Sequence, residues 1–188
     1  MLSGRKRFDT IDFLQSRHRS TKLSSNTFKG IRYYTQTMYA NGCVPEFEVY
    51  DVGMVNNLAY LKNNGELKAP VYIQFVMGIM GGIPATVDNL VYLRRTADEL
   101  MGKGNYIWSC AAAGRNQLPL TAAALAMGGN VRVGLEDNLY LQPGVLAKNS
   151  GEQVNAIGKI AREMGYDIAS PSEARAILGL KGLDKVAF

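Results

Sequence analysis

A short run at residues 131–138, VRVGLEDN, places one arginine and two adjacent acids at the end of an apolar segment. If the run is extended, Arg132, Gly134 and Glu136 share one face, because side chains alternate along a strand. An inward arginine and carboxylate are costly to desolvate unless they pair or take part in chemistry. We favour a functional cluster of Arg132, Glu136 and Asp137 over an ion pair that only caps the sheet, because adjacent acids repel each other.

Other charged side chains fall near the same predicted edge. Glu46 and Glu48 alternate onto one face of a short β-rich run, either inward, where they add acidic groups to the mouth, or outward as solvated edge residues. Arg115 lies where a later strand gives way to a helix. It is a candidate for an anion contact, and nearly as good a candidate for pairing with a carboxylate such as Glu136.

The loop at residues 78–82, GIMGG, follows a buried strand and precedes a helix, where backbone N–H groups can bind phosphate. Gly78, Gly81 and Gly82 are therefore candidates for cofactor binding. Their spacing is not the G-x-G-x-x-G of dinucleotide sites, so a Rossmann interpretation is weak. A tight loop without a ligand is the alternative.

Histidine and cysteine offer little further chemistry. The single histidine, His18, lies in a basic N-terminal segment, so a histidine-rich metal site is impossible within this chain. Cys110 falls in an apolar strand, where a buried, inert thiol is the default. The two cysteines, Cys43 and Cys110, form no disulfide framework, which favours a reduced, cytoplasmic setting.

Alternating elements must position these residues. Apolar runs predict strands at 46–50, 71–77, 106–112 and 131–135, and helical spacing predicts helices at 28–42, 54–64, from Pro84 to 100, 117–127 and 151–164. A last helix begins at Ser170-Pro171, with Glu173 completing a capping box, and ends at Gly179.

Strands that alternate with helices predict parallel β/α units with right-handed crossovers. An open doubly wound sheet and part of an eight-stranded barrel both fit this order. In either case function lies beyond the carboxyl ends of the strands. A complete eight-stranded barrel needs roughly 250 residues, and this chain of 188 residues has four predicted strands, so about half of a barrel is expected.

Composition excludes several classes. Much of the net charge of +5 comes from residues 1–22, while the rest of the chain is near neutral, so nucleic-acid binding is not expected. No apolar run approaches the ~20 residues of a membrane span, and the basic segment has no apolar core of a secretory signal.

Several motifs together resemble the beta-keto acid cleavage enzymes. Along the chain they are PEFEVYDVGMV, YIQFVMGIMGG, GGNVRVGLEDNLYL and SPSEARAILGL. They follow one another in the family's order, and the resemblance covers about residues 24–180. The resemblance implies the C-terminal half of a (βα)8 TIM-like barrel at residues 24–188. Residues 1–23 do not resemble the family and are expected to be a disordered leader.

The resemblance also implies an activity: a divalent metal, usually Zn²⁺, assists transfer of coenzyme A from acetyl-CoA to a beta-keto acid, which releases acetoacetate and a new acyl-CoA. Glu136 resembles the metal-ligand glutamate, and Arg132 and Asp137 resemble the catalytic arginine and aspartate. Glu48 matches the position that reads the substrate's distal amine.

Departures from the family define the remaining expectations. Two metal-binding histidines, a catalytic serine and an early glutamate belong to an N-terminal half that this chain lacks, and Asn130 replaces a common histidine. We therefore expect a fragment that is inactive and binds zinc poorly alone, and that needs the missing half-barrel or a homo-oligomer. A noncatalytic module that binds acyl-CoA or nucleotide phosphate at the glycine loop is the alternative.

Overall fold

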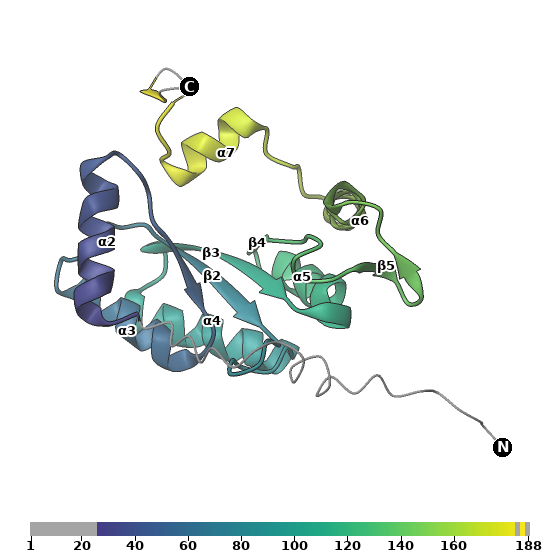
Figure 1. Ribbon diagram of the computed structural model, residues 1–188, viewed down its shortest axis with the longest axis horizontal. Coiled ribbons are helices and arrows are strands. Elements are labelled where there is room, and N and C mark those ends of the chain that lie inside the picture. Colours follow the sequence, from purple (N-terminus) through teal and green to yellow (C-terminus); the bar gives the residue numbers. More distant parts are fainter. Residues whose placement is uncertain (1–25, 183–184, 187–188) are drawn as a thin grey trace, which may run out of the picture.

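The computed structural model of the chain describes residues 26–182 and 185–186 (Figure 1). Four parallel strands form one sheet in the order β1-β2-β3-β4. They are β1 (Glu46–Val49), β2 (Val71–Met77), β3 (Tyr106–Ala112) and β4 (Asn130–Val131). The parallel β/α organisation predicted from the sequence is confirmed.

Helices connect the strands in the expected alternation. They are α2 (Phe28–Ala40), α3 (Val52–Asn63), α4 (Val87–Met101), α5 (Gln117–Ala126), α6 (Ser150–Glu163) and α7 (Pro171–Leu178). A 3-10 turn, η1 (Gly114–Asn116), precedes α5. No helix in the described part of the chain combines the length and apolar character needed to cross a membrane.

The core lies on one face of the sheet, which we call the outer face. Alternate strand residues on this face pack against α3, α4 and α5 and are almost fully buried; they include Val49, Ile73, Phe75, Trp108 and Cys110. Figure 1 shows α3 and α4 on one side of the strands and α7 on the other. The opposite, inner face carries Glu48, Gln74 and Ser109, which are aligned across β1, β2 and β3.

Two predicted boundaries are wrong. The fourth strand ends at Val131 and does not extend to residue 135, because the chain turns back to the Gly134 carbonyl oxygen, which accepts from the N–H groups of Asp137 and Asn138 at 3.2 and 3.1 Å. The helix expected from Pro84 begins after Thr86, whose hydroxyl oxygen accepts from the Asn89 N–H. Thr86 makes the better start because its side chain satisfies a free helix donor.

The C-terminal part contains one prediction that holds and one element that was not predicted. Ser170 and Glu173 form the reciprocal capping box of α7, and Gly179 ends that helix with φ 64°. The unpredicted element is an antiparallel hairpin of β5 (Tyr140–Gln142) and β6 (Val145–Leu146). It leads to α6 from the turn of residues 134–138, which we call the acidic turn because it contains Glu136 and Asp137. The tip of the hairpin contains Gly144 at φ 79°.

Candidate functional site

Arg132 occupies the centre of the candidate site. Its N–H donates to the Cys110 carbonyl oxygen at 2.9 Å, so it extends the β3–β4 hydrogen bonding one residue beyond the strand. Its side chain lies on the inner face of the sheet. There it donates to acceptors on β1 and β2 and to acceptors in the turn after β4.

The guanidinium of Arg132 has every N–H group engaged. Nε donates to Asp137 Oδ2 at 3.2 Å, and Nη2 donates to Asp137 Oδ1 at 3.2 Å and Glu136 Oε2 at 2.7 Å. Nη1 donates to Glu48 Oε1 at 3.0 Å and Gln74 Oε1 at 2.8 Å. Because a guanidinium has five donors, these bonds leave none unpaired.

Backbone bonds hold the acidic turn against Arg132. The Asp137 carbonyl oxygen accepts from the Gly114 N–H at 2.7 Å, and the Gly134 carbonyl oxygen accepts from Gln117 Nε2 at 3.0 Å. Asp137 is thereby well shielded, with 11% of its side chain exposed, whereas Glu136 is 83% exposed. The predicted cluster is present, but Glu136 reaches Arg132 across a turn and not by alternation along a strand.

The pKa of two cluster members is raised. Burial disfavours the charge of Arg132, but the charges of Asp137, Glu136 and Glu48 outweigh it, so its pKa lies above the ordinary value. Burial is also the main reason that the Asp137 pKa is raised, and Arg132 only partly opposes it. A carboxylate with a raised pKa, fixed against a cation, has the properties of a proton acceptor or an orienting group.

The two acids of β1 differ in their surroundings. Glu48 accepts from Arg132 and from the Tyr50 hydroxyl, and this second bond raises the pKa of Tyr50 to about 12. Glu46 precedes it by two residues on the same strand face, and burial together with the charge of Glu48 raises the Glu46 pKa. Of the two alternatives for Glu48, the inward one therefore holds.

The glycine loop is closed by its own backbone. The N–H groups of Gly78 and Gly82 donate to the Ile83 and Ile79 carbonyl oxygens, and the Ile83 N–H donates to the Tyr50 carbonyl oxygen. A Cβ at Gly78 would lie 2.8 Å from Ala85 Cβ, and one at Gly82 would lie 3.1 Å from the Tyr50 oxygen. These contacts explain Gly78 and Gly82 by packing, whereas Gly81 is explained by its positive φ of 87°. Cofactor binding at Gly78, Gly81 and Gly82 stays a prediction.

Arg115 makes no ion pair with the acids of the cluster, although the neighbouring Gly114 N–H donates to the Asp137 carbonyl oxygen. Arg115 is exposed in η1, and among residues 26–182 and 185–186 no carboxylate forms an ion pair with it. Cys110 is buried on the outer face, and burial raises its pKa to about 12, as expected of an inert thiol. His18 lies outside the described residues.

The described residues do not by themselves fit a metal ion. Nowhere in residues 26–182 and 185–186 do three or more histidine, cysteine, aspartate or glutamate side chains gather as a metal site. Glu136 and Asp137 are instead bonded to Arg132. Zinc binding by Glu136 therefore needs ligands beyond this part of the chain.

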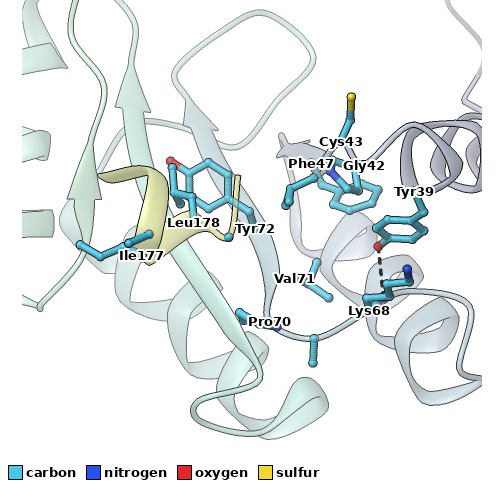
Figure 2. Close-up of a pocket in the computed structure, with 15 residues that line it drawn as sticks. Tyr39, Gly42, Cys43, Phe47, Lys68, Pro70, Val71, Tyr72, Ile177 and Leu178 are labelled. Atoms are coloured by element: carbon cyan, nitrogen blue, oxygen red, sulfur yellow. Dashed lines mark hydrogen bonds between the residues drawn. The ribbon is translucent and has the colours of Figure 1, made fainter. Parts of the chain in front are cut away.

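Neither of two pockets in the described residues encloses the cluster. One, of about 470 Å³, lies at the start of β2, where Ile177 and Leu178 of α7 face Tyr72 (Figure 2). None of the predicted site residues lines it. The other, of about 510 Å³, follows the free edge of β4 and includes Arg132 in its wall.

Gln74 and Tyr50 are the contacts that the sequence analysis missed. Gln74 is a lone amide within the run VYIQFVM, and this isolation in an apolar strand is the signal that could have identified it. Tyr50 follows Glu48 by two residues, and this spacing gave no separate indication of a hydrogen bond.

Comparison with known proteins identifies the relatives of this chain. The family model described as beta-keto acid cleavage enzyme matches residues 6–180. The match begins within the segment 1–23, and the division of the chain at residue 23 stays a prediction.

Individual relatives share this assignment. A 3,5-dioxohexanoate:acetyl-CoA acetone transferase of Paraburkholderia graminis is 46% identical over 87% of this chain and 52% of that protein. A 3-keto-5-aminohexanoate cleavage enzyme of Acetoanaerobium sticklandii is 41% identical over 82% of this chain and 55% of its own length. The chain thus spans about half the length of the curated relatives it matches. Correspondence to the C-terminal half stays a prediction.

Solved structures support the fold alone. The apo structure of ObcA aligns with a TM-score of 0.64 and 20% sequence identity, covering 83% of this chain and 40% of that one. Its binary complex with oxaloacetate aligns similarly, with a TM-score of 0.63 and 21% identity.

Proposed function

Because the chain belongs to the beta-keto acid cleavage enzyme family, we propose that it carries part of the active site of an acetyl-CoA-dependent acyltransferase. The reaction moves coenzyme A from acetyl-CoA to a beta-keto acid and releases acetoacetate and a new acyl-CoA. The observation that carries this proposal is the Arg132 cluster, in which one guanidinium is fixed by Glu48, Gln74, Glu136 and Asp137.

Arg132 is suited to stabilise the oxyanion that forms when a beta-keto acid is enolised or attacked. Donors that are already oriented need little reorganisation as charge develops, which lowers the barrier. Since all five N–H groups have partners, one acceptor must leave before a substrate oxygen can bind. Glu136 is the most exposed partner, so the Nη2 bond to Glu136 is the one that exchanges.

Asp137 is suited to orient Arg132 or to accept the alpha proton of the beta-keto acid. Its two oxygens contact Nε and Nη2, which fixes one edge of the guanidinium plane. Its raised pKa makes it a stronger base than an ordinary aspartate. A divalent metal, for which Glu136 is the candidate ligand, would supply Lewis-acid polarisation of the keto acid when bound.

Glu48 and Arg115 are proposed to contact the substrates. Glu48 is partly exposed beside Tyr50, so a cationic or donor group at the distal end of a beta-keto acid can reach it. One relative is named for an amino-substituted keto acid and another for a dioxo acid without an amine. Exposed Arg115 is available for an anionic group of acetyl-CoA.

The isolated chain is proposed to be inactive until further strands complete its site. Strands β1 and β4 are the edges of the described sheet, and unpaired edges favour association. The partner is the remaining half-barrel or a second copy of the chain.

An assay of acetyl-CoA-dependent acetoacetate release tests the proposal. The purified chain is assayed with zinc, alone and with the complementary half of a relative supplied in trans. Activity only with the added half, abolished by Arg132→Met and retained by the exposed control Arg95→Met, supports the proposal. Robust turnover by the chain alone, or rescued activity that survives Arg132→Met, contradicts it.

The noncatalytic alternative predicts a different outcome. Coenzyme A binding by the chain alone that resists chelation and is lost in Gly81→Asp, with no rescued turnover, would favour a binding module.

A further inference from the structure

Gln74 lies where an amide is costly unless it is bonded. It occupies the middle of β2 on the inner face, between Glu48 on β1 and Ser109 on β3, and is 4% exposed. Burial of an amide without a partner is unfavourable. Its Oε1 accepts from Arg132 Nη1 at 2.8 Å, so the buried oxygen is satisfied by the centre of the cluster.

The bond from Gln74 differs from the other bonds to Arg132 in shielding. The Glu48 side chain, which shares Nη1, is 41% exposed, and the Glu136 side chain is 83% exposed. Only Gln74 and Asp137 are well shielded from water, and they hold different edges of the guanidinium. Two fixed edges determine the plane of the group, while the exposed partners remain exchangeable.

The neutrality of Gln74 matters because the cluster is already acidic. Glu48, Glu136 and Asp137 surround a single cation. A fourth acceptor that carried charge would add repulsion among acids, whereas an amide oxygen supplies the acceptor alone.

We propose that Gln74 is a positioning residue for Arg132: with Asp137 it holds the guanidinium plane while the Nη2 donor facing Glu136 is released to a substrate oxygen. The release of this donor to a substrate oxygen rests on the proposed function, whereas the positioning of the guanidinium does not. Gln74 acts through Arg132 and not on the reacting atoms.

The test measures rotation of the Arg132 guanidinium by NMR in the 188-residue chain, labelled at arginine nitrogen. Arg132→Lys assigns the signals by removing them. The wild-type chain is expected to show separate, slowly exchanging Nη1 protons. In Gln74→Leu, which has similar volume and no acceptor, their rotation should become about 10- to 100-fold faster, since a bond from a charged donor contributes that factor.

Two further variants distinguish positioning from general loosening. Gln74→Glu keeps an acceptor oxygen at the same place, so rotation should be no faster than in the wild type. Ser109→Ala, the buried polar neighbour of Gln74 without a contact to Arg132, should leave rotation unchanged. Normal Nη1 rotation in folded Gln74→Leu overturns the proposal, as does faster rotation in Gln74→Glu. If Gln74→Leu does not fold, the Gln74→Glu result decides.

Activity in the complementation assay gives the functional arm. Gln74→Leu should lower kcat about 10- to 100-fold with little change in KM, because it misorients a donor used in the transition state. Absence of wild-type activity with altered rotation in Gln74→Leu would refute the proposed function and leave the positioning intact. If rotation in Gln74→Leu is unaltered and the wild type is active, the positioning role is refuted and the proposed function stands.

Discussion

The two faces of the sheet use the same strands for opposite purposes. On the outer face, residues such as Ile73, Phe75 and Trp108 are buried beneath α3, α4 and α5. On the inner face, the alternate residues Gln74 and Ser109 are also buried, but they are polar. The outer face is closed by helices within this chain, while the inner face meets Arg132. Stability should therefore depend mainly on the outer face and chemistry on the inner face.

Truncation of the outer face should have the largest effect. Phe75→Ala removes a fully buried ring that lies 5.7 Å, centroid to centroid, from Trp108. We expect the free energy of unfolding to fall by about 3–5 kcal/mol, or cooperative unfolding to be lost completely, because the surrounding core cannot fill the cavity that the ring leaves. Urea unfolding followed by circular dichroism measures it. Met80→Ala, at an 83% exposed side chain, is the control and should change little. An equally small effect at Phe75 would contradict a core on this face.

Removal of the cation on the inner face should cost less stability. Arg132→Met leaves Glu48 and Asp137 without their partner. We expect the free energy of unfolding to fall by about 1–3 kcal/mol at neutral pH. Solvent moderates this effect because the Arg132 side chain is 28% exposed. Arg132 opposes the raised pKa of Asp137, so that pKa should rise further in the variant. An acid with a raised folded pKa binds more protons when folded, so the variant should gain stability as the pH falls.

Urea unfolding of Arg132→Met at neutral and mildly acidic pH checks both parts of this expectation. Arg95→Met, whose partner Glu99 lies 3.9 Å away on the surface, is the matched control. A variant that lost equal stability at both pH values would refute the role of the inner carboxylates.

Ser109 should show that polarity on the inner face does not by itself add stability. Its Oγ is buried and has no hydrogen-bond partner among the described residues. Ser109→Ala is expected to lie within about 1 kcal/mol of the wild type, neutral or slightly stabilising, because an unbonded hydroxyl keeps its desolvation cost. Thermal unfolding measures the change. A strong destabilisation would contradict an unbonded Ser109 hydroxyl.

The Arg32–Glu66 ion pair lies apart from both faces and should have the smallest effect. The hydrogen bond from Arg32 lowers the pKa of Glu66, so its contribution is present above the ordinary glutamate pKa and is lost as the pH falls below it. Glu66→Gln should slightly reduce this acid dependence, which unfolding midpoints between pH 7 and pH 3 would reveal. Exposed pairs contribute little, so a large change would be unexpected.

The sequence was most informative where local signals agreed. The strands predicted at 71–77 and 106–112 have the same bounds as the observed β2 and β3. Their continuous apolar character between turn residues indicated strands buried on both faces. The capping box of Ser170 and Glu173 was also predicted, since it depends only on a local spacing.

Long-range contacts limited the prediction of the site. Gln74 lies 58 residues before Arg132 in the chain, and no local pattern links them. The fourth strand was predicted too long because apolar Val133 and Leu135 suggested extension, whereas the bonds to the Gly134 carbonyl oxygen form a turn. The hairpin of β5 and β6 was missed although Pro143-Gly144, between apolar segments, is a turn signal.

The position of Trp108 gives this chain a built-in optical reporter. It is the single tryptophan, it lies in β3 beneath the helices, and the guanidinium carbon of Arg94 stands 5.5 Å from its ring. A Cβ at Gly129 would lie 2.5 Å from the same indole, so the ring fills its space tightly. Fluorescence from Trp108 should therefore follow the packing of the helix-covered side, and a ligand that reorganises Arg132 without loosening the helices should leave that emission unchanged.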